Sequence, residues 1–181
     1  MHTCPSESWR SAILLIDKAA TALNRVAGAL AAVLLVYIFL HIITEIVLRS
    51  FFQSSTFVLD EFVGYAVAAM TFLSLGYALN EGSLIRVDLV VGSLTGRLRR
   101  WVELFCLGSS FGIAGFCAWW VGRDALRNWS RGSVSESIAE VPQWLPVGAV
   151  WLGLVLLMIQ IIACFLRVAA GGEPIRSDRA E

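Results

Sequence analysis

Four long apolar runs dominate the pattern of hydrophobic and polar positions along this chain. They cover residues 26–48, 62–79, 104–121 and 145–166. A helix needs about 20 apolar residues to cross about 30 Å of hydrocarbon. Because lipid offers no hydrogen-bond partners to the backbone, each run is predicted to be a helix. The predicted fold class is therefore all-α: one integral membrane unit over residues 1–181, with four transmembrane helices.

Two further segments have amphipathic helical patterns. In the N-terminal segment, residues 1–25, apolar positions such as Ala20 and Leu23 recur at helical spacing, while Asp17 and Asn24 fall on other faces. This segment either lies flat on the membrane or continues into the first span, and the lack of a breaker before the span favours continuity. A similar pattern in residues 84–98 predicts a short interfacial amphipathic helix between spans two and three.

The connections between spans differ in length. The connection formed by residues 50–59 is short, so spans one and two are predicted to form an antiparallel hairpin. Asp60 suits the N-cap of span two, and Glu61 suits its first turn, where the helix dipole favours negative charge. The longest connection, 122–144, is expected to be an exposed loop, with Pro146 in the first turn of span four.

Charge is scarce and unevenly distributed. Hydrophobic residues make up 57% of the 181 residues and charged residues 15%, whereas roughly a quarter is usual in soluble domains. One side of the membrane carries ten of the 14 basic residues, namely Arg10, Lys18, Arg25, Arg86, Arg97, Arg99, Arg100, Arg167, Arg176 and Arg179. The positive-inside rule therefore predicts cytoplasmic N- and C-termini, including the polar tail 167–181. Read this way, the basic excess indicates topology and no nucleic-acid partner. The first 25 residues do not have the pattern of a cleavable signal peptide.

Ionisable residues inside the first span are the first candidate site. His41, Glu45 and Arg49 stand at i, i+4 and i+8, which places them on one helix face. A charge in a membrane costs about 2.5–3.5 kcal/mol on insertion scales, so such residues are functional candidates. The simplest interpretation is an ion-pair ladder, which Asp60 and Glu61 could join across the hairpin. A contact with a partner subunit and a proton-linked role remain alternatives.

The sequence offers little for catalysis or redox chemistry. Only His41 lies in a predicted span, so a haem held by two membrane histidines is not expected. The four cysteines form no CxxC pair, and no three or four metal ligands cluster. We therefore expect no enzyme activity, no cofactor and no metal. Spans two to four lack charges, and Gly108 and Gly112 form a GxxxG pattern where another helix could approach. Such a chain is interpreted as a scaffold that packs on another protein.

A charged elbow follows span two. After an uncharged run, the chain reads Asn-Glu-Gly-Ser from residue 80 and then Ile-Arg-Val-Asp from residue 85. Its charged residues are Glu81, Arg86 and Asp88. They predict a fixed joint at the membrane surface, where another protein could dock, or a local set of charges that pair and cap a helix.

Four stretches carry a resemblance to a known family. They are LRSFF at 48–52, DEF at 60–62, LGYALNEGSLIRVDLV at 75–90 and GRLRRWVEL at 96–104. Their order and the four-span frame resemble the small membrane subunit (DctQ or SiaQ type) of tripartite ATP-independent periplasmic (TRAP) transporters.

The resemblance implies a role and a set of partners. It implies a large TRAP membrane subunit that carries solute and sodium, and a periplasmic solute-binding protein that delivers an organic acid. The small subunit would brace the large one, help the binding protein dock, and contact membrane lipids. The alternatives are a membrane-anchored assembly or regulatory protein without a transport role and, third, a small redox subunit.

Overall fold

The fold is a bundle of four helices, seen in a computed structural model that describes residues 7–55, 58–81 and 97–169. The helices are α1 (Glu7–Phe52), α2 (Leu59–Asn80), α4 (Arg97–Arg131) and α5 (Trp144–Ala169). Each contains one of the predicted spans, and all four are long and apolar enough to cross a membrane. The predicted all-α, four-span fold class is therefore confirmed.

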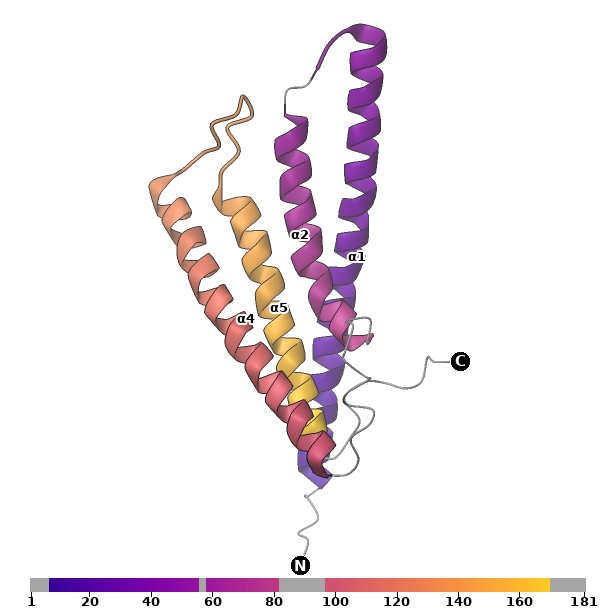
Figure 1. The fold of residues 1–181 in the computed structure, drawn as a ribbon, viewed down its shortest axis with the longest axis vertical. Helices are drawn as coiled ribbons and strands as arrows, with labels where there is room; N and C mark the ends of the chain where they lie inside the picture. The colour runs from indigo at the N-terminus through magenta and orange to yellow at the C-terminus, as the bar shows by residue number, and fades with distance from the viewer. Residues whose placement is uncertain (1–6, 56–57, 82–96, 170–181) are drawn as a thin grey trace, which may run out of the picture.

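Helix α5 is the centre of the bundle. Helices α1, α2 and α4 each pack against it, and α1 also packs against α2. In Figure 1 the helices lie side by side in the order α4, α5, α2, α1. They converge where α1 begins and α5 ends, and they spread apart toward the connections α1–α2 and α4–α5. We call these the narrow end and the wide end.

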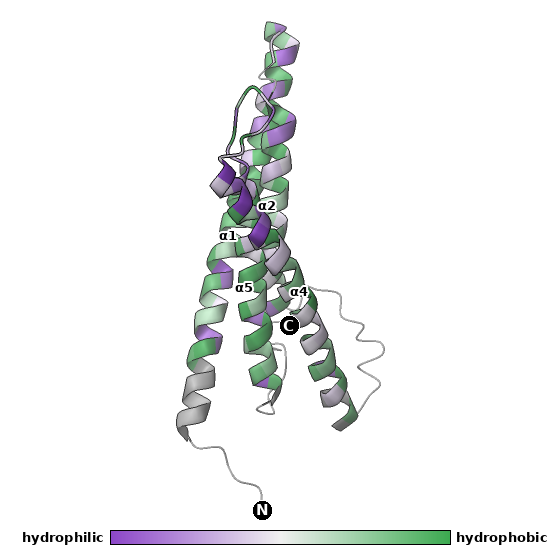
Figure 2. Ribbon diagram, turned by 90° about the vertical axis from the view of Figure 1, so that its left-hand side faces the viewer, coloured by the Kyte–Doolittle hydropathy of each residue, from purple (hydrophilic) through white to green (hydrophobic). Residues whose placement is uncertain are grey.

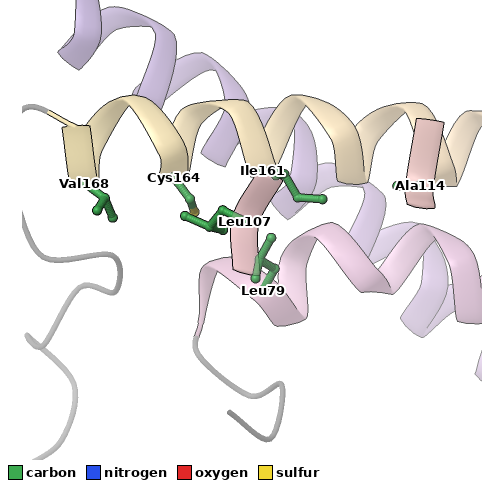
Figure 3. Packing of buried hydrophobic residues seen from close by; sticks show 6 residues of the cluster. All are labelled: Leu79, Leu107, Ala114, Ile161, Cys164 and Val168. Atoms are coloured by element: carbon green, nitrogen blue, oxygen red, sulfur yellow. The ribbon is translucent and has the colours of Figure 1, made fainter. Parts of the chain in front are cut away.

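Small and branched apolar residues fill the interior. One buried cluster joins α2, α4 and α5 and is shown in Figure 3: Leu79, Leu107, Ala114, Ile161, Cys164 and Val168. A second joins α1 to α2 through Ala27, Ala31 and Leu73. Many large hydrophobic side chains are also exposed on the outside of the helices, and long stretches of the helical ribbon are coloured as hydrophobic in Figure 2. This is expected of helices that face lipid.

Three buried amides link α1, α2 and α5. Asn24 Nδ2 donates to Gln160 Oε1 at 2.9 Å, and Gln160 Nε2 donates to Asn80 Oδ1 at 3.2 Å. Asn24 and Gln160 are fully buried, and Asn80 is 9% exposed. We call Asn24, Asn80 and Gln160 the polar clamp. A hydrogen bond between helices in a membrane is worth roughly 0.6–2 kcal/mol, and its geometry also sets helix register.

The polar clamp requires a close approach between α1 and α2. Asn24 Oδ1 is buried and has no hydrogen-bond partner among the described residues. It lies directly over Gly76, where a Cβ atom would be 1.9 Å from it. The oxygen therefore faces the Cα hydrogens of Gly76, a contact of the weak Cα–H···O type. Gly153 has a similar role between α5 and α2, because its Cβ would lie 2.5 Å from the backbone carbonyl carbon of Phe72.

The amphipathic pattern assigned the wrong face to part of α1. Asn24, expected away from the apolar face, is fully buried, whereas Leu23 is 50% exposed. In lipid the apolar side chains can face outward, so the polar amide turns toward the only hydrogen-bond partners available. Asp17 is also mostly buried, and it forms an ion pair with Arg167 of α5 at the narrow end. The segment and the span form one continuous 46-residue helix.

Two boundary predictions are wrong. Asp60 is not the N-cap of α2, because the carbonyl of Val58 already accepts the Phe62 N–H at 3.1 Å. Asp60 therefore lies inside the first turn. Glu61 lies there too, as predicted. The helix dipole still favours both acids there.

The loop predicted from Gly122 begins at Gly132, because α4 continues to Arg131. Gly132 has φ +62°, and its N–H bonds to Trp129 O, while Ser133 N–H bonds to Asn128 O. This pair of bonds is a Schellman motif, which needs a residue in the left-handed region and so suits glycine. The predicted interfacial helix at 84–98 falls almost wholly outside the described residues.

Substitution of Gly76 tests the close approach of α1 to α2. Gly76→Ala should lower the free energy of unfolding by about 1–3 kcal/mol, because the methyl group collides with the Asn24 amide. Gly64→Ala on the same helix meets no atom within 4 Å and should be neutral or stabilising. Adding Asn24→Ala to Gly76→Ala should recover part of the loss. Thermal unfolding in detergent measures the cycle, and simple additivity would contradict the contact.

Candidate functional site

Two members of the predicted ladder on α1, Glu45 and Arg49, form an ion pair at the wide end. Arg49 Nε donates to Glu45 Oε1 at 2.9 Å, one helical turn away. The Glu45 side chain is 2% exposed, whereas that of Arg49 is 61% exposed. The pair therefore holds a buried carboxylate next to a cation that can reach water or lipid headgroups. Such an arrangement avoids an uncompensated buried charge.

Ser55, which the sequence analysis did not single out, completes this site. Its hydroxyl donates to Glu45 Oε1 at 2.5 Å, and Arg49 Nη2 donates to Ser55 Oγ at 3.3 Å. Gln53 between them has φ +49°, an uncommon conformation for a residue with a side chain. We call Glu45, Arg49 and Ser55 the hairpin latch, because they tie the end of α1 to the turn that leads into α2.

His41 has aromatic neighbours rather than a place in the ladder. Its ring stacks on Tyr37, with centroids 5.6 Å apart and an interplanar angle of 14°, and meets Phe62 of α2 at 6.3 Å. His41 Nε2 is buried and has no hydrogen-bond partner within the described part of the chain. The ring thus packs between α1 and α2 much as an aromatic residue would.

Glu61 is tied to a different part of the fold from the ladder. Its Oε1 accepts a hydrogen bond from Tyr65 at 2.7 Å, and it lies against Ser135 and Ser137 of the α4–α5 loop. Asp60 is exposed. Glu61 could have joined the α1 ladder, but its hydrogen bonds do not reach it. They link α2 to the α4–α5 loop instead.

The elbow after α2 is described only at its first residue. The backbone N–H of Glu81 caps α2 by donating to Tyr77 O at 3.0 Å. Arg86 and Asp88 lie outside the described residues, so their predicted roles stay predictions.

The two glycines of the GxxxG pattern face outward. Gly108 and Gly112 are exposed, and a Cβ atom at either would meet no atom within 4 Å. Close approaches between helices occur instead at Gly76 and Gly153, at Gly122, where a Cβ would lie 2.7 Å from Trp151 Nε1, and at Gly28, where it would lie 3.0 Å from the Tyr77 ring. The GxxxG motif located an open surface, while the internal seams have no motif in the sequence.

No described residues form a metal site, since nowhere in 7–55, 58–81 and 97–169 do three His, Cys, Asp or Glu residues gather. Cys106 and Cys117 are exposed and Cys164 is buried, and no disulfide joins these three described cysteines.

The architecture that carries these sites matches one protein family. The family described as "Tripartite ATP-independent periplasmic transporters, DctQ component" matches residues 38–171, from the second half of α1 to the end of α5. The chain belongs to the DctQ family. It is the small, multi-pass membrane subunit of a TRAP transporter, as the resemblance predicted. No curated protein and no solved structure matches the chain.

Some of these sites lie within the residues that match the DctQ family, and others precede them. The hairpin latch, the elbow and two members of the polar clamp, Asn80 and Gln160, fall within the DctQ match. Asn24 and Asp17 precede residue 38. The first half of α1, which carries these two buried polar residues, is thus supported by the contacts of this structure rather than by the family pattern.

A double-mutant cycle tests the hairpin latch. Glu45→Gln should lower the free energy of unfolding by about 1 kcal/mol, because it removes the charge that Arg49 and Ser55 bind. Arg49→Gln combined with it should cost less than the two single losses together. Arg127→Gln, an exposed arginine of α4, is the control and should change little. Thermal unfolding in detergent gives the coupling, and its absence would refute the pairing.

Proposed function

We propose that this DctQ subunit braces the large membrane subunit of its TRAP transporter and helps the periplasmic solute-binding protein dock during sodium-coupled uptake of organic acids. The observation that carries the proposal is the hydrogen bonding of the buried polar side chains in the bundle interior. The buried amides bind one another in the polar clamp, and Glu45 binds Arg49 and Ser55, so these side chains are engaged within the bundle rather than offered to a solute between the described helices.

The interior polar groups support a bracing role. The buried polar and charged residues among those described are Thr21, Asn24, Glu45, Asn80 and Gln160. The amides pair within the polar clamp, and Glu45 pairs within the hairpin latch. Solute paths through membranes are instead lined by polar residues or broken helices. A bundle whose buried amides and buried carboxylate bind its own residues is suited to hold a shape.

Two surfaces are proposed for the partners. The elbow around Glu81, Arg86 and Asp88 is assigned to the large subunit, because it follows a rigidly packed helix at the membrane surface. The wide end is assigned to the binding protein, because the hairpin latch and the α4–α5 loop both stand there. The exposed Glu136, Ile138 and Glu140 of that loop offer both charge and apolar area.

Uptake assays in proteoliposomes test the brace. Arg86→Ala or Asp88→Ala should weaken association with the large subunit about tenfold, equal to about 1.4 kcal/mol. Maximal uptake should fall while the half-saturating solute concentration changes little. Lys18→Ala, an exposed charge near the narrow end, is the matched control. A shift of half-saturation at full maximal rate would indicate a solute site instead.

Omitting the subunit separates the brace from its main alternative, a membrane-anchored assembly or regulatory protein. Full uptake by the large subunit and binding protein without this chain would refute the bracing role.

Orientation is proposed from the charge bias: the narrow end and both termini lie in the cytoplasm. The location in a bacterial inner membrane is proposed from membership of the DctQ family. On a cysteine-free background, Glu136→Cys in the α4–α5 loop should react with an impermeant maleimide in intact cells. Ser93→Cys, between spans two and three, should react only after lysis. The reverse labelling pattern would overturn the orientation.

A further inference from the structure

An apolar groove lies between α4 and α5, on the half of the bundle near the narrow end. Its volume is 320 Å³, and its walls include Leu107, Gly108 and Phe111 of α4 with Ile161, Ile162 and Phe165 of α5. No polar atom contributes to its lining surface. The groove is therefore suited to a hydrocarbon ligand and offers nothing to hold a polar one.

The shape of the groove depends on one glycine. Gly108 has no atom within 4 Å of the position that a Cβ would occupy, so the floor is open beside it. Phe111 and Phe165 stand at the walls. A GxxxG contact between helices needs two smooth faces whose backbones can approach. A concave channel bordered by aromatic rings fits a thin, flexible chain better than a second helix.

The start of α4 carries positive charge in line with the groove. Arg97 and Arg100 precede Leu104, Leu107 and Phe111 at spacings of three and four residues, which is the repeat of one helix face. Ten residues separate Arg97 from Leu107, about 15 Å of helix. This is about half of the 30 Å hydrocarbon thickness, hence the depth of one leaflet. Arginine positions in the first turn of this helix, at headgroup level below an apolar groove, are complementary in charge to an anionic lipid.

We propose that the groove binds the acyl chain of one anionic phospholipid, whose headgroup lies at the arginine-rich start of α4. Trp101, on the same turn of α4 and 72% exposed, is placed where interfacial aromatic residues occur. The nearby Arg167 of α5 is already paired with Asp17. The bound lipid would fill the space beside Leu107 and Ile161 and so complete the packing between α4 and α5.

Lipid retention by the purified full-length chain tests this site without the large subunit. The delipidated protein is mixed with phosphatidylglycerol or with phosphatidylcholine of the same acyl chains, and bound lipid is counted by native mass spectrometry. One phosphatidylglycerol should be retained per chain, at least about tenfold better than phosphatidylcholine. Arg97→Gln with Arg100→Gln should remove this preference.

Filling the groove should displace the lipid. Gly108→Leu should lower phosphatidylglycerol retention about tenfold, and Ile162→Trp is a second substitution that narrows the channel. Gly112→Leu, on an equally open position that does not line the groove, should leave retention unchanged. Thermal unfolding verifies that each variant is folded.

Three outcomes would overturn the proposal. The first is equal retention of the two lipids by the wild type. The second is full retention by Gly108→Leu and Ile162→Trp. The third is unchanged lipid retention with weakened binding of the large subunit in Gly108→Leu, which would show that the groove holds a partner helix.

Discussion

The requirement that the buried amides and the buried carboxylate of Glu45 find partners inside the bundle shapes this molecule more than any other constraint. The hydrophobic effect that folds soluble proteins is weak between helices in lipid, because acyl chains are as apolar as leucine. What remains is close packing and hydrogen bonding. Gln160 at the centre of the polar clamp bonds to both Asn24 and Asn80, and it fixes α1 and α2 on α5. The absent side chain at Gly76 makes that geometry possible.

The same constraint explains why different contacts hold the two ends of the bundle together. At the narrow end, the polar clamp and the Asp17–Arg167 pair join the first helix to the last. At the wide end the helices spread. The hairpin latch closes one turn of chain there, and Glu61 of α2 meets the α4–α5 loop. The bundle is thus anchored at one end and presents loops at the other, which agrees with the proposed brace.

The spans and the local pairs were predictable, whereas the long-range contacts were not. Apolar runs near 20 residues located all four helices, and a spacing of four located the Glu45–Arg49 pair. The partner of Asn24 is 136 residues away, and no periodicity relates the two. The face of Asn24 was assigned by a rule for water, in which polar residues point outward, and lipid reverses that rule. Ser55 was missed because its role depends on the turn that folds it back.

The polar clamp also has a consequence for the order of assembly. A chain inserted from its N-terminus places α1 in the membrane first and α5 last. Until α5 arrives, the amides of Asn24 and Asn80 lack their bonds to Gln160, and Asn24 keeps its bond to the carbonyl of Ala20 on its own helix. The described contacts between the early spans are then apolar packing, the contact of His41 with Phe62, and the hairpin latch, which forms as soon as α2 follows α1. Completion of the last span acts as the closing step of biogenesis, and an insertion intermediate that stalls before it would expose unsatisfied amides to lipid and to quality-control proteases.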